Sequence, residues 1–170
     1  MQKNYYQAIL TTKLGPMIAI ADDEALCLLE FVDRRHLPRQ MKRLGFVETA
    51  LHLGRSKPID RIEHELQLYF ADQLTAFNTP LRPVGSAFQQ QVWAQLQKIP
   101  YGKTYSYLQL AQLMGKPSAY RAVANANGAN ALAIIIPCHR VINHNGALGG
   151  YAGGLSRKIE LIKHENKGNL

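Results

Sequence analysis

The chain has 170 residues, of which 46% are hydrophobic, and a formal net charge of +8. This length and apolar content suit one medium domain or two small ones, and no apolar run approaches the roughly 18 residues of a membrane span. The N-terminus lacks the apolar region of a secretory signal. We therefore expect a protein of the cytoplasm, associated with the nucleoid and with no membrane partner, in which Cys27 and Cys138 are thiols and not a disulfide. Neither cysteine has a second cysteine nearby, so no metal site is expected.

The positive charge is confined to the second part of the chain. Residues 1–72 carry equal numbers of basic and acidic residues, whereas residues 73–170 carry ten basic and two acidic residues. A neutral part joined to a basic part predicts a polyanionic partner for the basic one, and nucleic acid is the commonest such partner. The alternative is a generally basic protein without this partner.

Short apolar segments between turn residues predict an antiparallel meander near the N-terminus. Its strands are expected at residues 5–11, 17–21 and 25–32. Apolar side chains at helical spacing then predict two helices, over residues 34–44 and 58–70. Together these elements make a small α/β domain.

A segment with prolines and a glycine, residues 78–85, interrupts the helical periodicity close to the point where the charge balance changes. It is the best candidate for a linker. We therefore expect an N-terminal α/β domain over residues 1–80 and a second domain over residues 81–170.

Helical patterns open the second half. Ser86 can cap a helix through Ile99, since a hydroxyl at the cap accepts hydrogen bonds from first-turn amides. Residues 106–114 and 119–126 predict two shorter helices, separated by a Gly-Lys-Pro turn. A helix, a glycine-containing turn and a second helix form a helix-turn-helix pattern, which is typical of DNA-binding domains.

The second of these short helices offers an arginine to a partner. At about 100° per residue, Arg121 lies opposite the face predicted to be buried, and its neighbour Ala124 is small enough for close approach to a DNA groove. No carboxylate occurs between Asp72 and Glu160. We therefore predict that Arg121 contacts DNA, with a solvated arginine as the alternative. The face predicted to be buried consists of Ala119, Ala122, Val123 and Ala126.

A thiol stands at the end of an apolar run. Residues 134–136 are typical of a buried strand or core segment, and Pro137 ends regular strand pairing because it has no amide hydrogen. Cys138 and His139 follow. If the backbone turns here, His139 can take the thiol proton and produce the nucleophilic thiolate near neutral pH. The alternative is a core cysteine beside a surface histidine.

The last residues predict a mobile pocket wall and a helix. Residues 149–154 are too rich in glycine for regular structure and lack the lysine of a phosphate-binding loop. Residues 155–165 predict a helix with Glu165 near its C-terminus. A carboxylate there gains nothing from the helix dipole, so Glu165 is expected to have another partner.

Residues 137–141, Pro-Cys-His-Arg-Val, the glycine-rich residues 149–154 and the helix-turn-helix with Arg121 closely resemble the O6-alkylguanine-DNA alkyltransferases, or methylated-DNA–protein-cysteine methyltransferases. The resemblance covers about residues 86–165 in the correct order and spacing. It implies an α+β protein, in which a small ribonuclease-H-like α/β domain precedes a mainly helical domain with a winged-helix-like helix-turn-helix.

The resemblance implies direct reversal of damage in double-stranded DNA. The alkyl group of O6-alkylguanine, and also of O4-alkylthymine, would pass to Cys138 in a single turnover that leaves an inactivated S-alkylcysteine protein. No cofactor is implied. Some relatives hold structural zinc in the first domain, but Cys27 is the only cysteine there, so none is expected. We expect a monomer in solution and leave cooperative assembly on DNA open.

The resemblance also implies roles for individual residues around Cys138. His139 would act as a base through a water held by Glu165. Tyr107 would assist flipping of the damaged nucleotide and donate a hydrogen bond to guanine N3. Asn130 would brace the turn that carries the cysteine.

Other residues would contact the DNA or line the pocket. Arg121 would fill the place in the base stack that the flipped nucleotide vacates. The other DNA contacts are expected from Ala119, Tyr120, Ala122 and Ala124. The residues expected to line the substrate pocket are Val141, Tyr151, Ala152 and Lys158. Tyr120 stands where alanine is familiar, and Ala152 replaces the serine of some relatives, so Ala152 can offer its backbone amide but no hydroxyl.

Three other functions are compatible with parts of the pattern. An alkyltransferase-like damage sensor would bind the lesion without transfer, but such proteins lack the cysteine that Cys138 supplies. A helix-turn-helix regulator would read sequence in the major groove. A cysteine hydrolase would turn over an ester or peptide many times.

Overall fold

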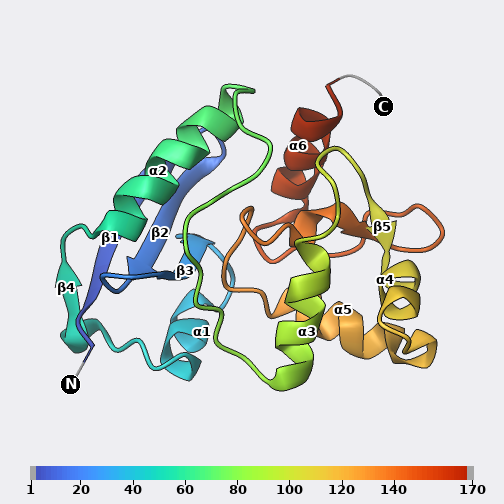
Figure 1. Cartoon of the computed structure of the whole chain (residues 1–170), viewed down its shortest axis with the longest axis horizontal. Helices are drawn as coiled ribbons and strands as arrows, with labels where there is room; N and C mark the ends of the chain where they lie inside the picture. The colour runs from blue at the N-terminus through green and yellow to red at the C-terminus, as the bar shows by residue number, and fades with distance from the viewer. Residues whose placement is uncertain (1–2, 168–170) are drawn as a thin grey trace. The chain divides into compact units, whose positions relative to one another are not determined.

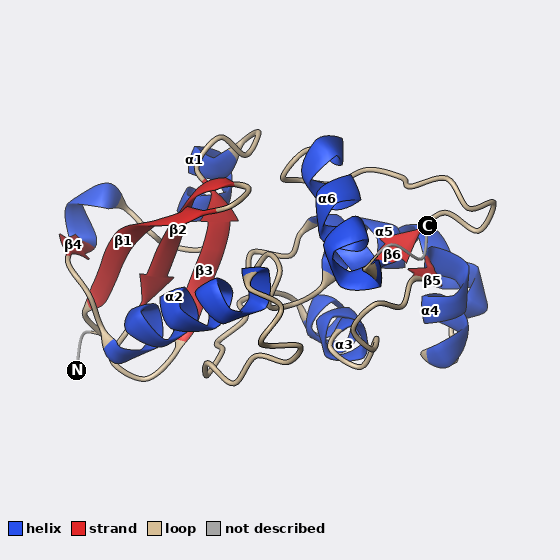
Figure 2. Cartoon of the chain, turned by 90° about the horizontal axis from the view of Figure 1, so that it is seen from above, coloured by secondary structure: helices blue, strands red, loops and turns tan. Residues whose placement is uncertain are grey.

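A computed structural model describes residues 3–167 (Figures 1 and 2). The chain divides into two units, one that ends at Val84 and one that begins at Gly85. No helix within residues 3–167 is both long enough and apolar enough to cross a membrane.

The first unit is built on a mixed four-stranded sheet with the strand order β3-β2-β1-β4. The predicted antiparallel meander is confirmed: β1 pairs with β2, and β2 pairs with β3. A fourth strand, which the sequence did not predict, runs parallel to β1. It is three residues long and mostly exposed, so it carries no buried apolar pattern. The strands are β1 (Tyr5–Thr12), β2 (Gly15–Ala21), β3 (Leu26–Phe31) and β4 (Leu51–Leu53).

Two helices cover this sheet, on opposite sides in Figure 2. Helix α1 (Leu37–Arg43) begins later than predicted, after His36 in the left-handed region, and packs Leu37 and Met41 against the core. Helix α2 (Lys57–Phe70) matches the prediction and buries an apolar stripe of Ile59, Ile62, Leu66 and Tyr69. A 3₁₀ turn, Glu48–Ala50, precedes β4.

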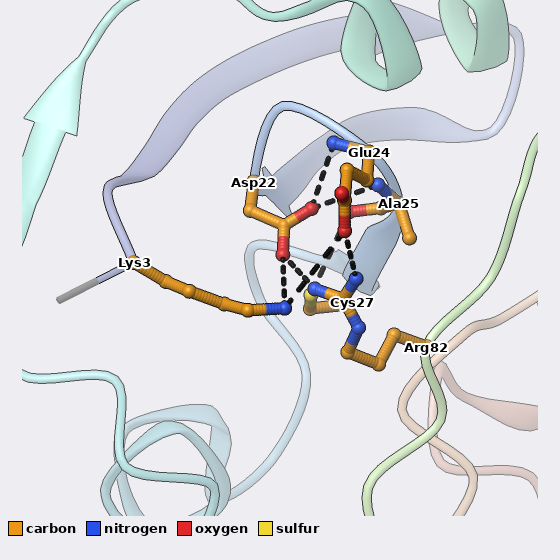
Figure 3. A network of polar contacts seen from close by, with 6 residues as sticks. All are labelled: Lys3, Asp22, Glu24, Ala25, Cys27 and Arg82. Carbon is orange, nitrogen blue, oxygen red and sulfur yellow. Dashed lines mark hydrogen bonds and ion pairs between the residues drawn. The ribbon is translucent and has the colours of Figure 1, made fainter. Parts of the chain in front are cut away.

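Residues 81–84 belong to the first unit, although the sequence placed the boundary after residue 80. The reason is backbone pairing: Leu26 N–H donates to Pro80 O and Arg82 N–H donates to Leu26 O, both at 2.8 Å. Arg82 also forms ion pairs with Asp22 and Glu24 (Figure 3). The segment therefore extends the edge of the sheet at β3 instead of forming a free linker.

The second unit is mainly helical. A capping box between Ser86 and Gln89 begins its first helix, which ends at Leu96 instead of Ile99. The helices are α3 (Ala87–Leu96), α4 (Tyr107–Leu113), α5 (Tyr120–Gly128) and α6 (Leu155–Asn166). Two-residue strands, β5 (Tyr105–Ser106) and β6 (Val141–Ile142), pair in parallel and were not predicted, because segments this short carry no periodicity. The chain also forms 3₁₀ turns at Pro117–Ala119 and Cys138–Arg140.

Helices α4 and α5 form the predicted helix-turn-helix, and Gly115 turns between them at φ 69°. The buried face of α5 differs from the prediction. Val123 and Ala126 are buried, but Ala122 is exposed and Ala119 lies half-buried in the preceding 3₁₀ turn. The buried residues Val123, Ala126 and Asn127 follow an i, i+3, i+4 stripe, so the inward face of α5 passes through Asn127 instead of Ala122. The Trp93 indole N–H fixes this helix by donating to Ala126 O at 2.9 Å.

Candidate active site

Cys138 lies in a stretch, residues 131–140, in which every residue is buried. The strand alternative for residues 134–136 is wrong and the core-segment alternative is confirmed, because this stretch turns and Ile134 has φ 70°. A β-branched residue in the left-handed region costs about 1–3 kcal/mol, so its surroundings must hold it there. The turn then delivers Cys138 as the first residue of a 3₁₀ turn, 6% exposed.

Asn130 holds this turn from within. Its side-chain amide donates to Ile136 O at 2.9 Å, and its side-chain oxygen accepts from Leu132 N–H at 3.0 Å. Asn130 is 3% exposed, so both hydrogen bonds form away from water and bridge the start and the end of the apolar run. Asn130 therefore ties the two ends of the run together and braces the turn.

His139, next to the thiol, is fully buried and bound to the last helix. Its Nε2 lies 2.8 Å from Oε1 of Glu165, while its Nδ1 has no hydrogen-bond partner within residues 3–167. Since a carboxylate can only accept, Nε2 carries the proton in the neutral ring and Nδ1 presents a lone pair. The predicted partner for Glu165 is thus His139, and the free lone pair belongs to a potential base.

Arg140 completes the group and was missed by the sequence analysis. Its guanidinium donates to both carboxylate oxygens of Glu165, at 2.8 and 3.0 Å, and to Ile99 O at 2.7 Å. The available signal was its place in the Pro-Cys-His-Arg-Val motif, together with the shortage of carboxylates in this half of the chain. A buried bidentate pair of this kind fixes the carboxylate in orientation.

The pKa values of His139 and Glu165 are both lowered, for different reasons. Burial outweighs the attraction of Glu165 and lowers the pKa of His139 below its ordinary value of 6.5, so the imidazole is neutral at neutral pH. Hydrogen bonds and charge from His139 and Arg140 hold the pKa of Glu165 far below its ordinary value, against the effect of burial. Glu165 is therefore a permanent carboxylate, and His139 is free to accept a proton.

Lys158 of α6 holds the glycine-rich loop. Its buried ammonium donates to Val141 O at 2.6 Å, to Gly150 O at 3.2 Å and to Leu148 O. Burial lowers its pKa to about 8, and the charge of Cys138 acts in the opposite direction, which places the ammonium near the thiol. The predicted pocket lysine thus lies beside Cys138 and fastens the pocket wall.

Tyr107, at the start of α4, places its hydroxyl beside the glycine-rich loop. A methyl group added at Gly149 would lie 3.5 Å from that oxygen, so the loop approaches the tyrosine closely. Burial and the charge of Cys138 raise the pKa of Tyr107, and a hydrogen bond with the side chain of Asn127 opposes them. Asn127 also donates to Cys138 O at 3.4 Å, and no sequence pattern singled it out.

The remaining predicted pocket residues lie along the loop. Val141 is buried in β6 and gives its carbonyl to Lys158, while Tyr151 and Ala152 are half-buried in the turn before α6. Their backbone amides lie within the loop that Lys158 fastens. Within residues 3–167, no group of three or more His, Cys, Asp or Glu side chains could hold a metal ion.

The outer face of α5 is exposed and free of acids. Arg121 and Ala122 are exposed, Ala124 is half-buried, and Tyr120 is 41% exposed with its ring 5.5 Å from the Arg121 guanidinium. Three of the predicted DNA-contacting residues, Tyr120, Arg121 and Ala122, are therefore exposed at the start of α5, whereas Ala119 and Ala124 are half-buried.

Comparisons with known proteins agree with this geometry. The family described as "6-O-methylguanine DNA methyltransferase, DNA binding domain" matches residues 87–167. A methylated-DNA–protein-cysteine methyltransferase of Methanosarcina acetivorans is 40% identical over 94% of this chain and 97% of its own. That of Mycobacterium leprae is 40% identical over 92% and 89%. The chain belongs to the methylated-DNA–protein-cysteine methyltransferase family.

The chain also resembles solved structures of the family over nearly all of its length. The crystal structure of Mycobacterium tuberculosis OGT in complex with DNA has a TM-score of 0.85 at 36% identity and covers 95% of this chain and 93% of its own. The M. tuberculosis O6-methylguanine methyltransferase gives 0.83 at 35%, with 96% and 93% covered. The predicted α+β class, with an N-terminal mixed sheet and a helical DNA-binding domain, is confirmed, and the methyltransferase is a repair protein for O6-methylguanine in DNA.

Proposed function

We propose that Cys138 is the residue that receives the methyl group, in one displacement. The bond between the methyl carbon and guanine O6 breaks as the bond to Sγ forms. The electron pair of the broken bond stays with guanine, which takes up a proton and becomes the normal base. The thiol proton leaves through His139. The observation that supports this assignment most is the neutral, buried His139 with an open Nδ1 directly after the cysteine.

His139 acts as the base through a bridging water. Glu165 holds the imidazole ring in place, and Arg140 holds Glu165. The Nε2 hydrogen is committed to Glu165, so the only lone pair of the ring is at Nδ1. A proton arriving there makes an imidazolium beside a permanent carboxylate, which stabilises it. The ammonium of Lys158 near Cys138 favours the thiolate in the same step.

Tyr107 assists departure of the purine. A hydrogen bond from its hydroxyl to guanine N3 reduces the charge that builds on the leaving base. The raised pKa of Tyr107 supports this role, because the hydroxyl keeps its proton at neutral pH and can donate it. The backbone around Val141 and the amides of Tyr151 and Ala152 read the base edge and O6.

DNA enters against α5. The target atom lies inside the stack, so the nucleotide must be flipped out, and Arg121 fills its place from the minor-groove side. The exposed, carboxylate-free surface around Arg121, with small Ala122 and Ala124 beside it, supports this docking. Binding is sequence-independent and weakens as salt rises, because phosphate contacts dominate it.

The proposal includes further properties of the protein. A thioether has no good leaving group, so each protein molecule is spent after one transfer. O4-alkylthymine is a second substrate, since it presents an alkylated exocyclic oxygen on a ring carbon, as O6-alkylguanine does. We further propose that the protein is a monomer in solution, acts on double-stranded alkylated DNA in the cytoplasm and needs no cofactor.

A time course with excess substrate tests this function. Purified protein is mixed with a duplex that carries one O6-methylguanine, at a tenfold excess of lesion over protein. We expect restored guanine to rise to one equivalent of protein and then stop. Continued turnover would indicate a hydrolase-like recycling step. Tight lesion binding without restored guanine would indicate a damage sensor, and binding that depends on the flanking sequence would indicate a regulator.

A further inference from the structure

Asn127 lies where the DNA-binding helix meets the reacting groups. It occupies the last turn of α5, six residues after Arg121, and is 5% exposed. Its side chain reaches both the backbone of Cys138 and the side chain of Tyr107. A buried amide between the nucleophile and the proton donor is more than core packing requires, because apolar side chains fill a core without polar cost.

The carbonyl of Cys138 fixes which way the Asn127 amide points. A carbonyl oxygen only accepts, so the side-chain nitrogen and not the oxygen must face it, at 3.4 Å. An amide nitrogen has two hydrogens, which leaves a second one for another acceptor. The side-chain oxygen of Asn127, by contrast, has no hydrogen-bond partner within residues 3–167.

The second hydrogen goes to Tyr107. Asn127 also forms a side-chain hydrogen bond with Tyr107. Because the side-chain oxygen of Asn127 has no hydrogen-bond partner within residues 3–167, the amide nitrogen must be the group that meets the phenol oxygen. Tyr107 thus accepts from Asn127, and its own hydrogen must point elsewhere. Gly149 lies beside the hydroxyl, because a methyl group added there would be 3.5 Å from its oxygen, and the glycine places no side chain on that side.

We propose that Asn127 is a positioning residue for alkyl transfer: it turns the hydroxyl hydrogen of Tyr107 toward the flipped base and anchors the carbonyl of Cys138 to the DNA-binding helix. The inference rests on the proposed roles of Cys138 and Tyr107. Both faces of α5 would then serve the transfer. Arg121 on the exposed face engages the duplex, and Asn127 on the buried face orients the groups that react.

A double-mutant cycle tests the proposal. Asn127→Asp keeps the shape but replaces the donor by an acceptor, which repels Cys138 O and takes the hydrogen of Tyr107 for itself. Single-turnover rates on the O6-methylguanine duplex are measured for Asn127→Asp, Tyr107→Phe and the double variant. Asn4→Asp, the same change at an exposed position of the first unit, serves as the matched control.

We expect Asn127→Asp to slow transfer about 10- to 100-fold in the presence of Tyr107, as loss of an oriented hydrogen-bond donor does. In the Tyr107→Phe background no hydroxyl remains to be oriented, so only the loss from repelling Cys138 O should remain, which we expect to be less than about threefold. Equal losses in both backgrounds would overturn the proposal and leave Asn127 a structural residue. Asn127→Leu provides the same comparison if the aspartate variant does not fold.

The controls separate this proposal from the function on which it rests. A wild-type protein that fails to restore guanine would refute the proposed function itself. If transfer is normal and Tyr107→Phe has no effect, the role of Tyr107 fails and the positioning role of Asn127 fails with it. If Tyr107→Phe slows transfer but Asn127→Asp and Asn127→Leu do not, only the positioning role is overturned.

Discussion

The two cysteines of the chain differ little in exposure and greatly in surroundings. Cys27 is 2% exposed in the middle of a regular strand, and Cys138 is 6% exposed in a 3₁₀ turn. Burial raises the pKa of Cys27 to about 11, and its Sγ contacts only Ala25 O, at 3.6 Å, among the hydrogen bonds we describe for it. Cys138 has a neutral histidine directly after it and an ammonium nearby. The two thiols therefore differ in the base and the cation that lie near Cys138 and not in burial, and this difference predicts that Cys138 is the reactive one.

The largest expected effect is the loss of one thiol and not the other. Cys138→Ala should abolish transfer and retain binding to the lesion duplex. Cys27→Ala should leave the transfer rate within about twofold, at a stability cost of about 1 kcal/mol for the lost core contacts. Single-turnover transfer and thermal denaturation measure both. Residual transfer in Cys138→Ala would mean that the acceptor is misassigned.

Removal of the Glu165 carboxylate, which binds His139, should have the next largest effect. Glu165→Gln leaves Arg140 buried without its partner, so we expect a loss of about 3–5 kcal/mol in the free energy of unfolding. Transfer should slow about 100-fold because His139 loses the carboxylate that stabilises its protonated form. Denaturant unfolding and single-turnover rates provide the two values.

Glu160→Gln is the matched control on the same helix. Its carboxylate is 57% exposed and lies 3.8 Å from Lys163, so both values should remain close to those of the wild type. If Glu165→Gln transfers at the normal rate while Glu160→Gln also does, Glu165 has no part in the proton path.

Arg121→Ala separates the surface of α5 from the chemistry around Cys138. We expect about a tenfold loss of transfer on duplex substrate, the size of one lost stacking contact. Transfer from the free O6-methylguanine base should be unchanged, because no nucleotide has to be flipped. Arg39→Ala removes an exposed arginine from the first unit and should affect neither substrate. Equal losses on both substrates would contradict the flipping role.

The pH profile should show the smallest effect. Because the pKa of His139 is depressed, its neutral form persists as pH falls through 6.5, and the transfer rate should stay level there. On the alkaline side, Lys158 loses its charge with a pKa of about 8, so the rate should fall to about half near that pH. Lys158→Arg, which stays charged, should remove this decline. A fall on the acid side with a midpoint of 6.5 would mean that burial does not shift His139.

The same histidine links pH to stability. The unfolded chain takes up a proton at this residue near pH 6.5, whereas the folded protein does so only at lower pH. The unfolded state thus binds more protons in that interval, and the free energy of unfolding should decrease as pH falls below 6.5. Denaturant titrations on either side of pH 6.5 measure this slope.

Sequence patterns predicted the fold where the elements are long enough to show a period. The meander of the first unit and helices α2, α4 and α6 were predicted to within a few residues. The strands β4, β5 and β6 were not, since two or three residues define no alternation. The buried run ending at Ile136 was ambiguous for another reason: the spacing of apolar side chains shows neither the left-handed backbone at Ile134 nor the hydrogen bonds that Asn130 makes to the run.

The active site was predictable to the extent that the motif names its residues. Cys138 and His139 were predicted from the motif, and Glu165 from its unfavourable place near a helix C-terminus. The structure brings His139 and Glu165 into contact. Arg140 and Asn127 were missed because their importance depends on partners far along the chain, Ile99 and Tyr107 among them. Residue type alone cannot distinguish such an arginine or asparagine from one that faces solvent.

One measurement tests the central claim most directly. The protein is incubated with a duplex carrying one O6-methylguanine, and the masses of the intact protein and of its Cys27 and Cys138 peptides are determined. The account predicts one added methyl group per molecule, entirely on the Cys138 peptide, with Cys27 unchanged. A methyl group on Cys27, or restored guanine with both peptides unmodified, would contradict it.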